Sequence, residues 1–500
     1  MAEDRQDSAR PEEENQFRAA RIDKLEKMRA LGVNPYPYGF ERTAEAAEIE
    51  QRHSGLATGE TSTDRVAVAG RIRAIRNSGL FIDLHDQTGK IQIFSHKDYL
   101  SEAQIQLVKL LDLGDLIGVK GLVRKTPRGE LTINADEVTV LAKALLPLPE
   151  KYHGLADIET RYRQRYLDLI MNPESRETLR RRSLILASIR RMLIDKGFLE
   201  VETPMLHTIP GGASAKPFVT HHNALDMQLY LRIAPELHLK RLLVGGLSEK
   251  LFEINRNFRN EGLSPRHNPE FTSIELYQAF ADYLTMMDLT EELISGAALA
   301  ARGATKLAYG DKEIELAGPW PRKTMAELVQ EKTGIDFLAI SSPEAARDAA
   351  RGIGADVPKG ASWGHALEAA FGEKVEAGLI QPIHVTGFPR DISPLAKGDR
   401  HDPRLTERFE SYINGWEVAN AFSEINDPLD QRSRFEGQMK ERERGDEEAQ
   451  LMDEDFVTSL EYGMPPAGGL GIGIDRLVMI LTDSPSIRDV IAFPTMRPKA

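Results

Sequence analysis

The residues from Phe252 to Tyr277 carry the side chains best suited to bind a charged ligand. Polar and apolar residues alternate on both sides of the turn Gly262-Leu263-Ser264-Pro265, which predicts a β-hairpin. Its polar face would combine Glu253, Asn255, Asn257, Arg259, Glu261, Phe271, Ser273, Glu275 and Tyr277. Such a face is either solvated surface, the commoner case, or the floor of a ligand site. Arg259, Arg266 and His267 are cationic donors of the kind that bind phosphates. Phe271 is placed to stack on a base.

A second polar hairpin is predicted over residues 408–424. Asn414-Gly415 indicates a two-residue turn, which would set Glu410 opposite Ala419 and place Glu410 and Glu417 on one face. Two carboxylates without His or Cys suit a Mg²⁺ ion that bridges phosphates. The next polar positions have the opposite parity in a straight strand: Asn420, Phe422 and Glu424. Only a twist or a bulge would bring both sets into one site.

The stretch from Gly468 to Arg476 places glycines on a strand that leads into a helix. Glycines remove side chains where another group must approach closely, and Arg476 would begin the helix. The spacing is not that of a phosphate-binding P-loop, because no Gly-Lys-Ser/Thr follows. It is also a poor dinucleotide fingerprint, because no βαβ unit surrounds it.

Residues 64 to 142 are predicted to form a small barrel of short strands, such as the OB-fold. If Ile82, Leu84, Ile91 and Ile93 fill its core, then Phe81, Gln92 and Phe94 point outward. Arg71, Arg73 and Arg76 are nearby in the sequence. Rings stack on unpaired bases, amides read their edges and guanidinium groups hold phosphates, so this surface suits single-stranded RNA. Packing of the aromatic rings against a neighbouring domain is the alternative.

The remaining elements suggest how the chain is divided. The first sixteen residues are predicted to be a disordered acidic tail, followed by a basic helix from Phe17 to Leu31 that either is solvated or contacts RNA. Pro147-Leu148-Pro149 indicates a stiff linker, and residues 176–196 a long helix before an alternating strand. The predicted fold class is α+β. The predicted boundaries are 1–63 for the tail and basic helix, 64–145 for the barrel, 146–170 for the linker, and 171–500 for a large domain with a helical insertion over 300–390.

Composition narrows the class of protein. Five hundred residues exceed one hydrophobic core, and no segment approaches the ~20 apolar residues of a membrane span. The absence of cysteine excludes disulfides and thiolate metal sites. The polar start has no signal-peptide pattern, so we expect a cytoplasmic protein. The net charge of −13 requires that basic residues be segregated if the protein binds RNA.

Three stretches together resemble the signature motifs of the class II aminoacyl-tRNA synthetases. They are GFLEVETPML for the first motif, FRNEGLSPRHNPEF for the second and GLGIGIDR for the third. The resemblance extends from about Arg21 to Pro498 and includes RIAPEL, NAFSEINDP and FPTMRP. It is strongest to the lysine-specific enzymes of bacterial type. It implies an N-terminal OB-fold β-barrel for the anticodon, then a catalytic domain with a central antiparallel sheet flanked by helices.

The resemblance also implies residue roles. In catalysis, Arg259 would stabilise the α-phosphate of ATP and Arg476 would hold the γ-phosphate. The remaining ATP contacts would come from Glu261, His267 and Phe271. Mg²⁺ would be held by Glu410 and Glu417. The lysine substrate would contact Gly212, Glu236, Glu275, Tyr277, Asn420, Phe422 and Glu424. The anticodon would be bound by Arg76, Phe81 and Gln92.

Charge favours lysine over the related aspartyl and asparaginyl substrates. A buried ammonium group requires carboxylates, and Glu236, Glu275 and Glu424 would supply them without an obvious basic partner. The implied partners are tRNA(Lys), ATP, L-lysine and a second copy of the chain, with no membrane. Two alternatives stay open: a ligase that modifies a protein lysine, and a non-enzymatic RNA-binding relative. The predicted barrel argues against the first, and the presence of Arg259, Arg476 and the two Mg²⁺ carboxylates argues against the second.

Overall fold

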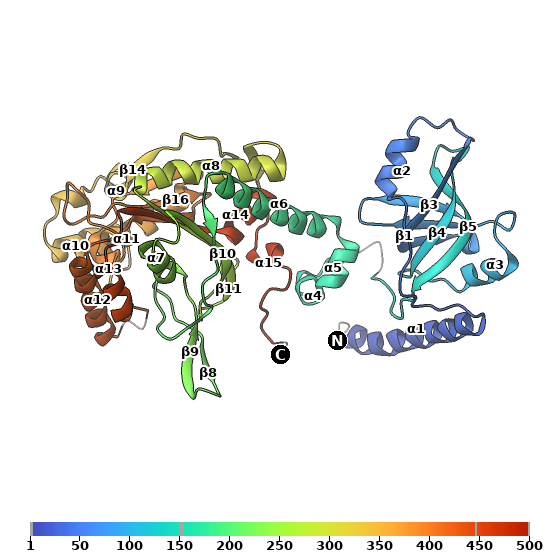
Figure 1. Cartoon of the computed structure of the whole chain (residues 1–500), viewed down its shortest axis with the longest axis horizontal. Helices are drawn as coiled ribbons and strands as arrows, with labels where there is room; N and C mark the ends of the chain where they lie inside the picture. Colours follow the sequence, from blue (N-terminus) through green and yellow to red (C-terminus); the bar gives the residue numbers. More distant parts are fainter. Residues whose placement is uncertain (1–3, 150–154, 446–447, 499–500) are drawn as a thin grey trace. The chain divides into compact units, whose positions relative to one another are not determined.

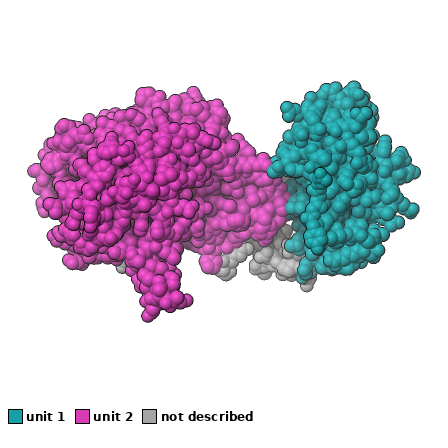
Figure 2. All heavy atoms as spheres, in the orientation of Figure 1, with its two compact units in different colours: residues 1–154 teal, residues 155–500 magenta. Residues whose placement is uncertain are grey.

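The computed structural model describes residues 4–149, 155–445 and 448–498, with side chains from residue 15 onward. The start of the predicted tail, residues 1–3, and positions 150–154 of the predicted linker lie outside the described residues. The chain forms two compact units, residues 1–154 and 155–500, which are coloured separately in Figure 2. No helix in the described ranges is both long and apolar enough to cross a membrane.

Unit 1 is built around a closed five-stranded barrel with the order β1-β2-β3-β5-β4. The strands are β1 (Thr61–Arg76), β2 (Phe81–His85), β3 (Lys90–Phe94), β4 (Leu116–Lys125) and β5 (Leu131–Ala142). Ile82, Leu84, Ile91 and Ile93 are buried in its core, as their alternation predicts. The helices of this unit are α1 (Asp4–Ala30), α2 (Ala46–His53) and α3 (Glu102–Lys109). The predicted OB-fold barrel is confirmed.

The N-terminal helix differs from the prediction. Helix α1 begins at Asp4 rather than at Phe17, so most of the predicted disordered tail is helical. Its residues are rich in Glu, Arg, Gln and Ala, which favour helices. Arg21 is buried and donates hydrogen bonds to the carbonyls of Leu113, Ala144 and Leu146. Arg21, one of the basic residues of this helix, therefore fixes α1 to the rest of unit 1.

Unit 2 is organised by an eight-stranded sheet with the order β14-β15-β16-β17-β18-β11-β10-β6. The strands are β6 (Leu199–Glu200), β10 (Lys250–Phe258), β11 (Glu270–Ala279), β14 (Arg322–Thr324), β15 (Ile383–Thr386), β16 (Arg408–Ile413), β17 (Trp416–Ser423) and β18 (Ala467–Gly473). The central strands are antiparallel, as predicted, whereas β6 pairs with β10 and β14 with β15 in parallel. The sheet is therefore mixed at its two edges.

Helices cover one face of this sheet. α6 (Pro173–Asp195), α8 (Tyr283–Arg302) and α14 (Ile474–Thr482) lie along it (Figure 1) and pack on Phe252, Leu276, Leu470 and Ile472. Successive side chains of a strand point to opposite faces, so the neighbouring polar residues of β10, β11 and β17 and the glycines of β18 share the other face. On that other side, α7 (Glu236–Val244), α12 (Pro428–Glu443) and α13 (Glu454–Glu461) pack around a smaller core that contains Leu237, Tyr277, Phe435 and Phe456.

Two predicted segments need correction. The linker predicted over 146–170 is too long, because α4 (Ile158–Arg163) and α5 (Arg165–Met171) are helical. Arg165 of α5 is buried and donates hydrogen bonds to the carbonyls of Arg488, Ile491 and Ala492, which fixes the helix to unit 2. The insertion predicted as helical over 300–390 is mixed: β14 and β15 extend the main sheet, and β12 (Lys306–Tyr309) pairs with β13 (Lys312–Glu315).

The other elements of this region and of the chain end are short. The helices are α9 (Met325–Thr333), α10 (Pro343–Gly352), α11 (Trp363–Lys374) and α15 (Ile487–Val490). A separate sheet joins β7 (Leu206–His207), β9 (Met227–Leu231) and β8 (Val219–His222), and its hairpin projects from the body of the unit (Figure 1).

Candidate active site

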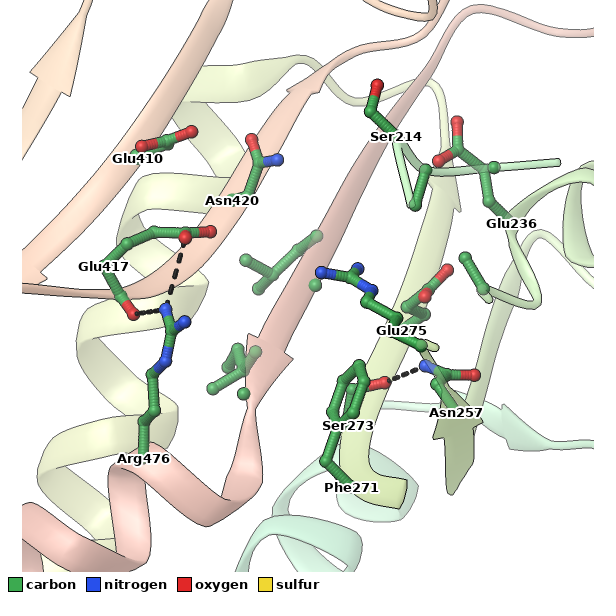
Figure 3. A pocket seen from close by; sticks show the side chains of 18 of the residues that line it. Ser214, Glu236, Asn257, Phe271, Ser273, Glu275, Glu410, Glu417, Asn420 and Arg476 are labelled. Carbon is green, nitrogen blue, oxygen red and sulfur yellow. Dashed lines mark hydrogen bonds and ion pairs between the residues drawn. The ribbon is translucent and has the colours of Figure 1, made fainter. Parts of the chain in front are cut away.

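A β-bulge solves the parity problem of the second polar hairpin. Tyr412 pairs with Glu417 as predicted, but Ser411 then pairs with Ala419, so that Val418 is the extra residue. Glu410 consequently lies opposite Asn420 instead of the predicted Ala419. A bulge inserts one residue and reverses the parity beyond it. Glu417 and Asn420 therefore face the same side, together with Glu410 (Figure 3).

Strand β18 lies between the two polar hairpins, and its glycines keep the space above it open. Gly471 pairs with Glu275 on one side and with Asn420 on the other, and Gly469 pairs with Tyr277 and Phe422. A Cβ atom at Gly469 would lie 1.9 Å from Oε1 of Glu424 and 2.7 Å from the Tyr277 ring. Any larger residue here would fill the site, which explains the glycine-rich sequence.

The sheet floor and its surrounding loops enclose a cavity of about 410 Å³. All fourteen site residues predicted in the large domain line it: Gly212, Glu236, Arg259, Glu261, His267, Phe271, Glu275, Tyr277, Glu410, Glu417, Asn420, Phe422, Glu424 and Arg476. Figure 3 shows Glu417 and Asn420 on one side of β18, and Asn257 and Glu275 on the other. Residues up to 264 positions apart in the sequence thus converge on one cavity.

Arginine side chains mark one part of the cavity. The Arg259 guanidinium lies 5.1 Å from the centre of the Phe271 ring, and its buried Nε has no hydrogen-bond partner. Arg476 donates hydrogen bonds to the carbonyl and carboxylate oxygens of Glu417, and lies 3.0 Å from Nε2 of His267. Burial, followed by the charges of Arg476 and Arg266, lowers the pKa of His267. This part of the cavity suits an anion.

Glu410 and Glu417, the predicted metal ligands, also line the cavity, and Glu417 forms an ion pair with Arg476. Glu410 accepts hydrogen bonds from Arg408 (2.6 Å) and from the Tyr412 hydroxyl (2.7 Å). Burial and the negative charge of Glu417 raise the pKa of Glu410 to about 7. No cluster of three or more Asp, Glu or His side chains that could hold a metal is found in the described ranges. The two carboxylates still suit a divalent cation if a phosphate ligand supplies the other oxygens.

Three carboxylates gather at the other end of the cavity. Burial, followed by repulsion from Glu236, raises the pKa of Glu275 to about 8. Burial also raises the pKa of Glu424 to about 8 and that of Glu236, and Lys240 opposes both shifts. Oε1 of Glu424 is buried without a hydrogen-bond donor, whereas Oε2 has the Lys240 ammonium group as its partner. This end of the cavity is electrostatically unsatisfied and suits a cation.

Sequence reasoning was wrong about basic partners at this end. The Lys240 ammonium lies 2.6 Å from Oε1 of Glu236 and forms an ion pair with Glu424. The helical spacing of four residues between Glu236 and Lys240 was a signal that could have revealed this contact. Asn257, whose amide donates to Ser273 while its buried oxygen has no partner, also lines the cavity and was not singled out.

The three predicted anticodon residues lie in unit 1, outside this cavity. Phe81 pairs with Arg76 on β1 and with Phe94 on β3, and the two rings are 5.1 Å apart. Arg76 forms a two-pronged ion pair with Asp83 at 2.6 and 2.9 Å. The Gln92 side-chain oxygen accepts a hydrogen bond from Thr132. The barrel thus carries a partly exposed surface of aromatic, amide and guanidinium groups.

Comparison with known proteins matches both units. A family model described as "tRNA synthetases class II (D, K and N)" matches residues 157–497, and one for an OB-fold nucleic acid binding domain matches residues 66–141. The lysine–tRNA ligase of Rhizobium meliloti is 57% identical over 96% of both chains. The lysine–tRNA ligase of Carboxydothermus hydrogenoformans is 55% identical over 98% of this chain and 99% of its own. With this agreement over its whole length, the chain belongs to the class II tRNA synthetases of the D, K and N group.

Proposed function

We propose that this protein is a lysine–tRNA ligase, which activates L-lysine with ATP to lysyl-adenylate and transfers lysine to the 3′-terminal adenosine of tRNA(Lys). The observation that carries the proposal is the polarity of the cavity. Arg476 and His267 contact each other in one part of the cavity, and Glu236, Glu275 and Glu424 interact electrostatically with one another in another part. An aspartyl or asparaginyl substrate would need a different set of groups around its side chain.

The first step would need positioning and charge stabilisation rather than a protein nucleophile. The carboxylate of lysine attacks the α-phosphorus of ATP, the bond to the bridging oxygen breaks, and pyrophosphate leaves. Arg259 would stabilise the added negative charge, since its Nε is free to donate. Phe271 would stack on adenine beside Glu261, and Arg476 with His267 would bind the terminal phosphates. The terminal hydroxyl of tRNA then attacks the mixed anhydride and releases AMP.

Mg²⁺ is part of this proposal, with Glu410 and Glu417 as its protein ligands. The raised pKa of Glu410 supports this role, because the buried Glu410 carboxylate and the partly exposed Glu417 carboxylate repel each other until a cation lies between them. When bound, the ion would neutralise phosphate charge. Loading would require Glu417 to exchange its contact with Arg476 for the ion.

The lysine substrate would lie over the glycine strand. Glu236 would bind its α-ammonium group, and Gly212 would lie against its backbone. At the far end, Glu275, Tyr277 and Glu424 would surround the ε-ammonium group. Asn420 and Phe422 would line the path of the aliphatic side chain. The buried Oε1 of Glu424 supports this placement, because a buried acceptor without a donor is costly.

Anticodon binding by unit 1 is proposed for Arg76, Phe81 and Gln92. Phe81 is partly exposed on the outer surface of the barrel, as base stacking requires. To bind a phosphate, Arg76 would have to share its charge with Asp83. A cytoplasmic location also belongs to the proposal, since tRNA charging serves translation.

A homodimer is proposed through the first-motif region. Leu184, Ile194 and Leu199 are 42–52% exposed there, which is unusual for a cluster of large apolar side chains. Ile189 and Leu193 of the same helix are fully buried within unit 2, so they are not available to such an interface. Leu184→Asp should weaken the dimer, and light scattering with an activity assay would measure this. An active monomeric wild type at working concentration would rule out the dimer.

Amino-acid-dependent exchange of pyrophosphate into ATP tests the proposed function most directly. Lysine should support exchange, whereas aspartate and asparagine should not. A charging assay with tRNA should then accumulate lysyl-tRNA. Exchange with lysine but no transfer to tRNA would favour the alternative ligase that modifies a protein lysine. No exchange with any amino acid would indicate a non-enzymatic relative.

A further inference from the structure

Lys240 is a fully buried cation at the carboxylate end of the cavity. It lies on α7 one helical turn after Glu236, and its ammonium group contacts both Glu236 and Glu424. The rings of Phe422 and Tyr277 lie 5.4 and 5.9 Å from the same nitrogen. Two carboxylates and two aromatic faces therefore hold this cation in one place.

The carboxylates separate Lys240 from the cavity. Glu236 and Glu424 are among the described residues that line the cavity, whereas Lys240 is not, and its side chain is 0% exposed. A ligand would therefore contact the carboxylates and not the ammonium group. Any effect of Lys240 on a ligand must act through the position and charge of Glu236 and Glu424.

The balance of charge at this end is informative. Glu275 adds a third carboxylate; it accepts a 3.4 Å hydrogen bond from Tyr277 and forms no ion pair within the described ranges. The nearby Glu253 is neutralised by Arg232 at 2.7 Å. Lys240 thus compensates one of three carboxylates. With all three carboxylates ionised, as bound ammonium groups would favour, the remaining excess of two negative charges matches the α- and ε-ammonium groups of a lysine substrate.

We infer that Lys240 is a positioning residue for the amino-acid substrate: it fixes Glu236 and Glu424 at the two ends of the amino-acid site and sets the site's charge to match a substrate with two ammonium groups. The inference rests on the proposed function, because it takes lysine as the substrate. A merely structural lysine would hold the same carboxylates without making their charge specific for a substrate with two ammonium groups.

The ionisable groups around Lys240 predict how pH should act. Glu236 faces it from its own helix, Tyr277 and Glu275 from β11, and Glu424 from the end of β17; Arg408 also acts on Glu236, and Arg232 on Glu275. Burial raises the pKa of the carboxylates, and Lys240 opposes this for Glu236 and Glu424. Without Lys240 these pKa values would rise further, so lysine binding would require a higher pH.

The sharpest test compares Glu424→Gln with the double variant Lys240→Met/Glu424→Gln. The single variant leaves too little negative charge for lysine and should raise KM for lysine about 100-fold or more in pyrophosphate exchange. The double variant restores the excess of two negative charges. It should bind lysine about tenfold more tightly than Glu424→Gln alone, although it has lost one more native contact. KM for ATP should change less than about twofold in both.

The single variant Lys240→Met supplies the pH readout. We expect KM for lysine to rise about tenfold near neutral pH and its pH dependence to move upward by about one unit. The double variant removes both charges of the Lys240–Glu424 ion pair, so neither is left buried alone. Its comparison with Glu424→Gln therefore tests the role of Lys240 even if Lys240→Met does not fold. A double variant no better than Glu424→Gln would overturn the inference and leave Lys240 as a packing residue.

Lys143→Met is the matched control. Lys143 is also 0% exposed between two carboxylates, Asp112 and Asp115, but lies in unit 1. It should leave KM for lysine unchanged, and a rise equal to that of Lys240→Met would overturn the inference. Failure of the proposed function has a different signature: wild-type protein would then show no lysine-dependent exchange. Lysine-dependent wild-type exchange without compensation in the double variant would reject only the role of Lys240.

Discussion

Each unit of the protein buries a lysine between two carboxylates, yet the two clusters differ in how completely they are satisfied. In unit 1, Asp115 accepts hydrogen bonds from Lys143 and from the backbone amides of Asp112 and Ala144. The pKa of Asp112 is lowered, because hydrogen bonds from Lys143 and Lys24 outweigh the effect of burial. Every charge in this cluster has a partner.

The cluster at Lys240 is built from the same residue types but stays open on one side. Oε1 of Glu424 lacks a hydrogen-bond donor, and the pKa values of Glu236, Glu275 and Glu424 are raised instead of lowered. A closed cluster, in which every charge has a partner, stabilises the fold. An open cluster, in which carboxylates remain unpaired, can gain free energy by binding a cationic ligand. The direction of the carboxylate pKa shift separates the two cases.

The largest effect should come from removing charge in the open cluster. Glu424→Gln or Glu275→Gln should cost about 3–5 kcal/mol of lysine binding, because the buried ammonium would be undercompensated. ATP binding, which uses arginines elsewhere in the cavity, is the control. A neutral lysine analogue should lose less than lysine does. Calorimetric affinities for lysine that equal those of the wild type would place the amino-acid site elsewhere.

Glu275 also predicts how the stability of the ligand-free protein depends on pH. Its folded-state pKa of about 8 is raised above the ordinary value of 4.5. Below about pH 4.5, Glu275 is protonated in both the folded and the unfolded protein, and its contribution to folding stability is fully present. That contribution is lost as the pH rises through 8, because the ionised carboxylate is disfavoured in the buried site. Above about pH 8, Glu275→Gln should therefore have a higher unfolding free energy than the wild type in the ligand-free protein. Thermal melting from acidic to alkaline pH would measure it, and a Tm that falls in the variant would contradict the open-cluster interpretation.

The closed cluster should respond in the opposite way. Lys143→Met leaves the buried Asp115 without a cation and leaves Asp112 with Lys24 alone, so it should destabilise unit 1 by about 3 kcal/mol or more. Denaturant unfolding followed by circular dichroism would detect this loss. Lysine-dependent exchange at temperatures where the barrel is folded should be unaffected. A variant as stable as the wild type would remove the distinction between the clusters.

Arg259→Ala should separate binding from chemistry in the open site. Its guanidinium is expected to act mainly as charge builds up on the α-phosphate, so adenylate formation should lose about 3 kcal/mol or more of transition-state stabilisation. Lysine affinity should stay near that of the wild type, because Arg259 is not part of the carboxylate cluster. Single-turnover kinetics with a lysine titration would measure both. Near-normal exchange would exclude Arg259 from its proposed role.

The smallest effect is expected on the outer surface of the barrel. Phe81→Ala should remove one stacked base and weaken tRNA charging by about 1–3 kcal/mol, while adenylate formation is spared. Asp83→Ala, which frees Arg76 from its ion pair, provides a second probe of the same surface. Steady-state charging with varied tRNA concentration is the measurement. Unchanged charging by Phe81→Ala would mean that its contact with Phe94 is only structural.

Much of this molecule follows from local sequence patterns. Strand alternation predicted which residues of β2, β3, β10 and β11 face inward, because side chains on a strand alternate strictly. The Asn414-Gly415 turn predicted the pairing of Ile413 with Trp416. The glycines of β18 indicated close approach, and Gly469 indeed lies against Glu424 and Tyr277. These features depend on backbone geometry over a few residues.

Other features required the tertiary structure, because they depend on contacts between distant residues. The bulge at Val418 unites Glu417 with Asn420 and is imposed by pairing with β16 and β18 together. The strands β14 and β15 are too short to be recognised before their place at the sheet edge is known. Lys240 and Lys143 are both lysines in ordinary sequence contexts. Only the fold decides that Lys143 is enclosed by satisfied carboxylates and that Lys240 lies behind carboxylates that line a cavity, since burial and charge pairing are properties of the packed molecule.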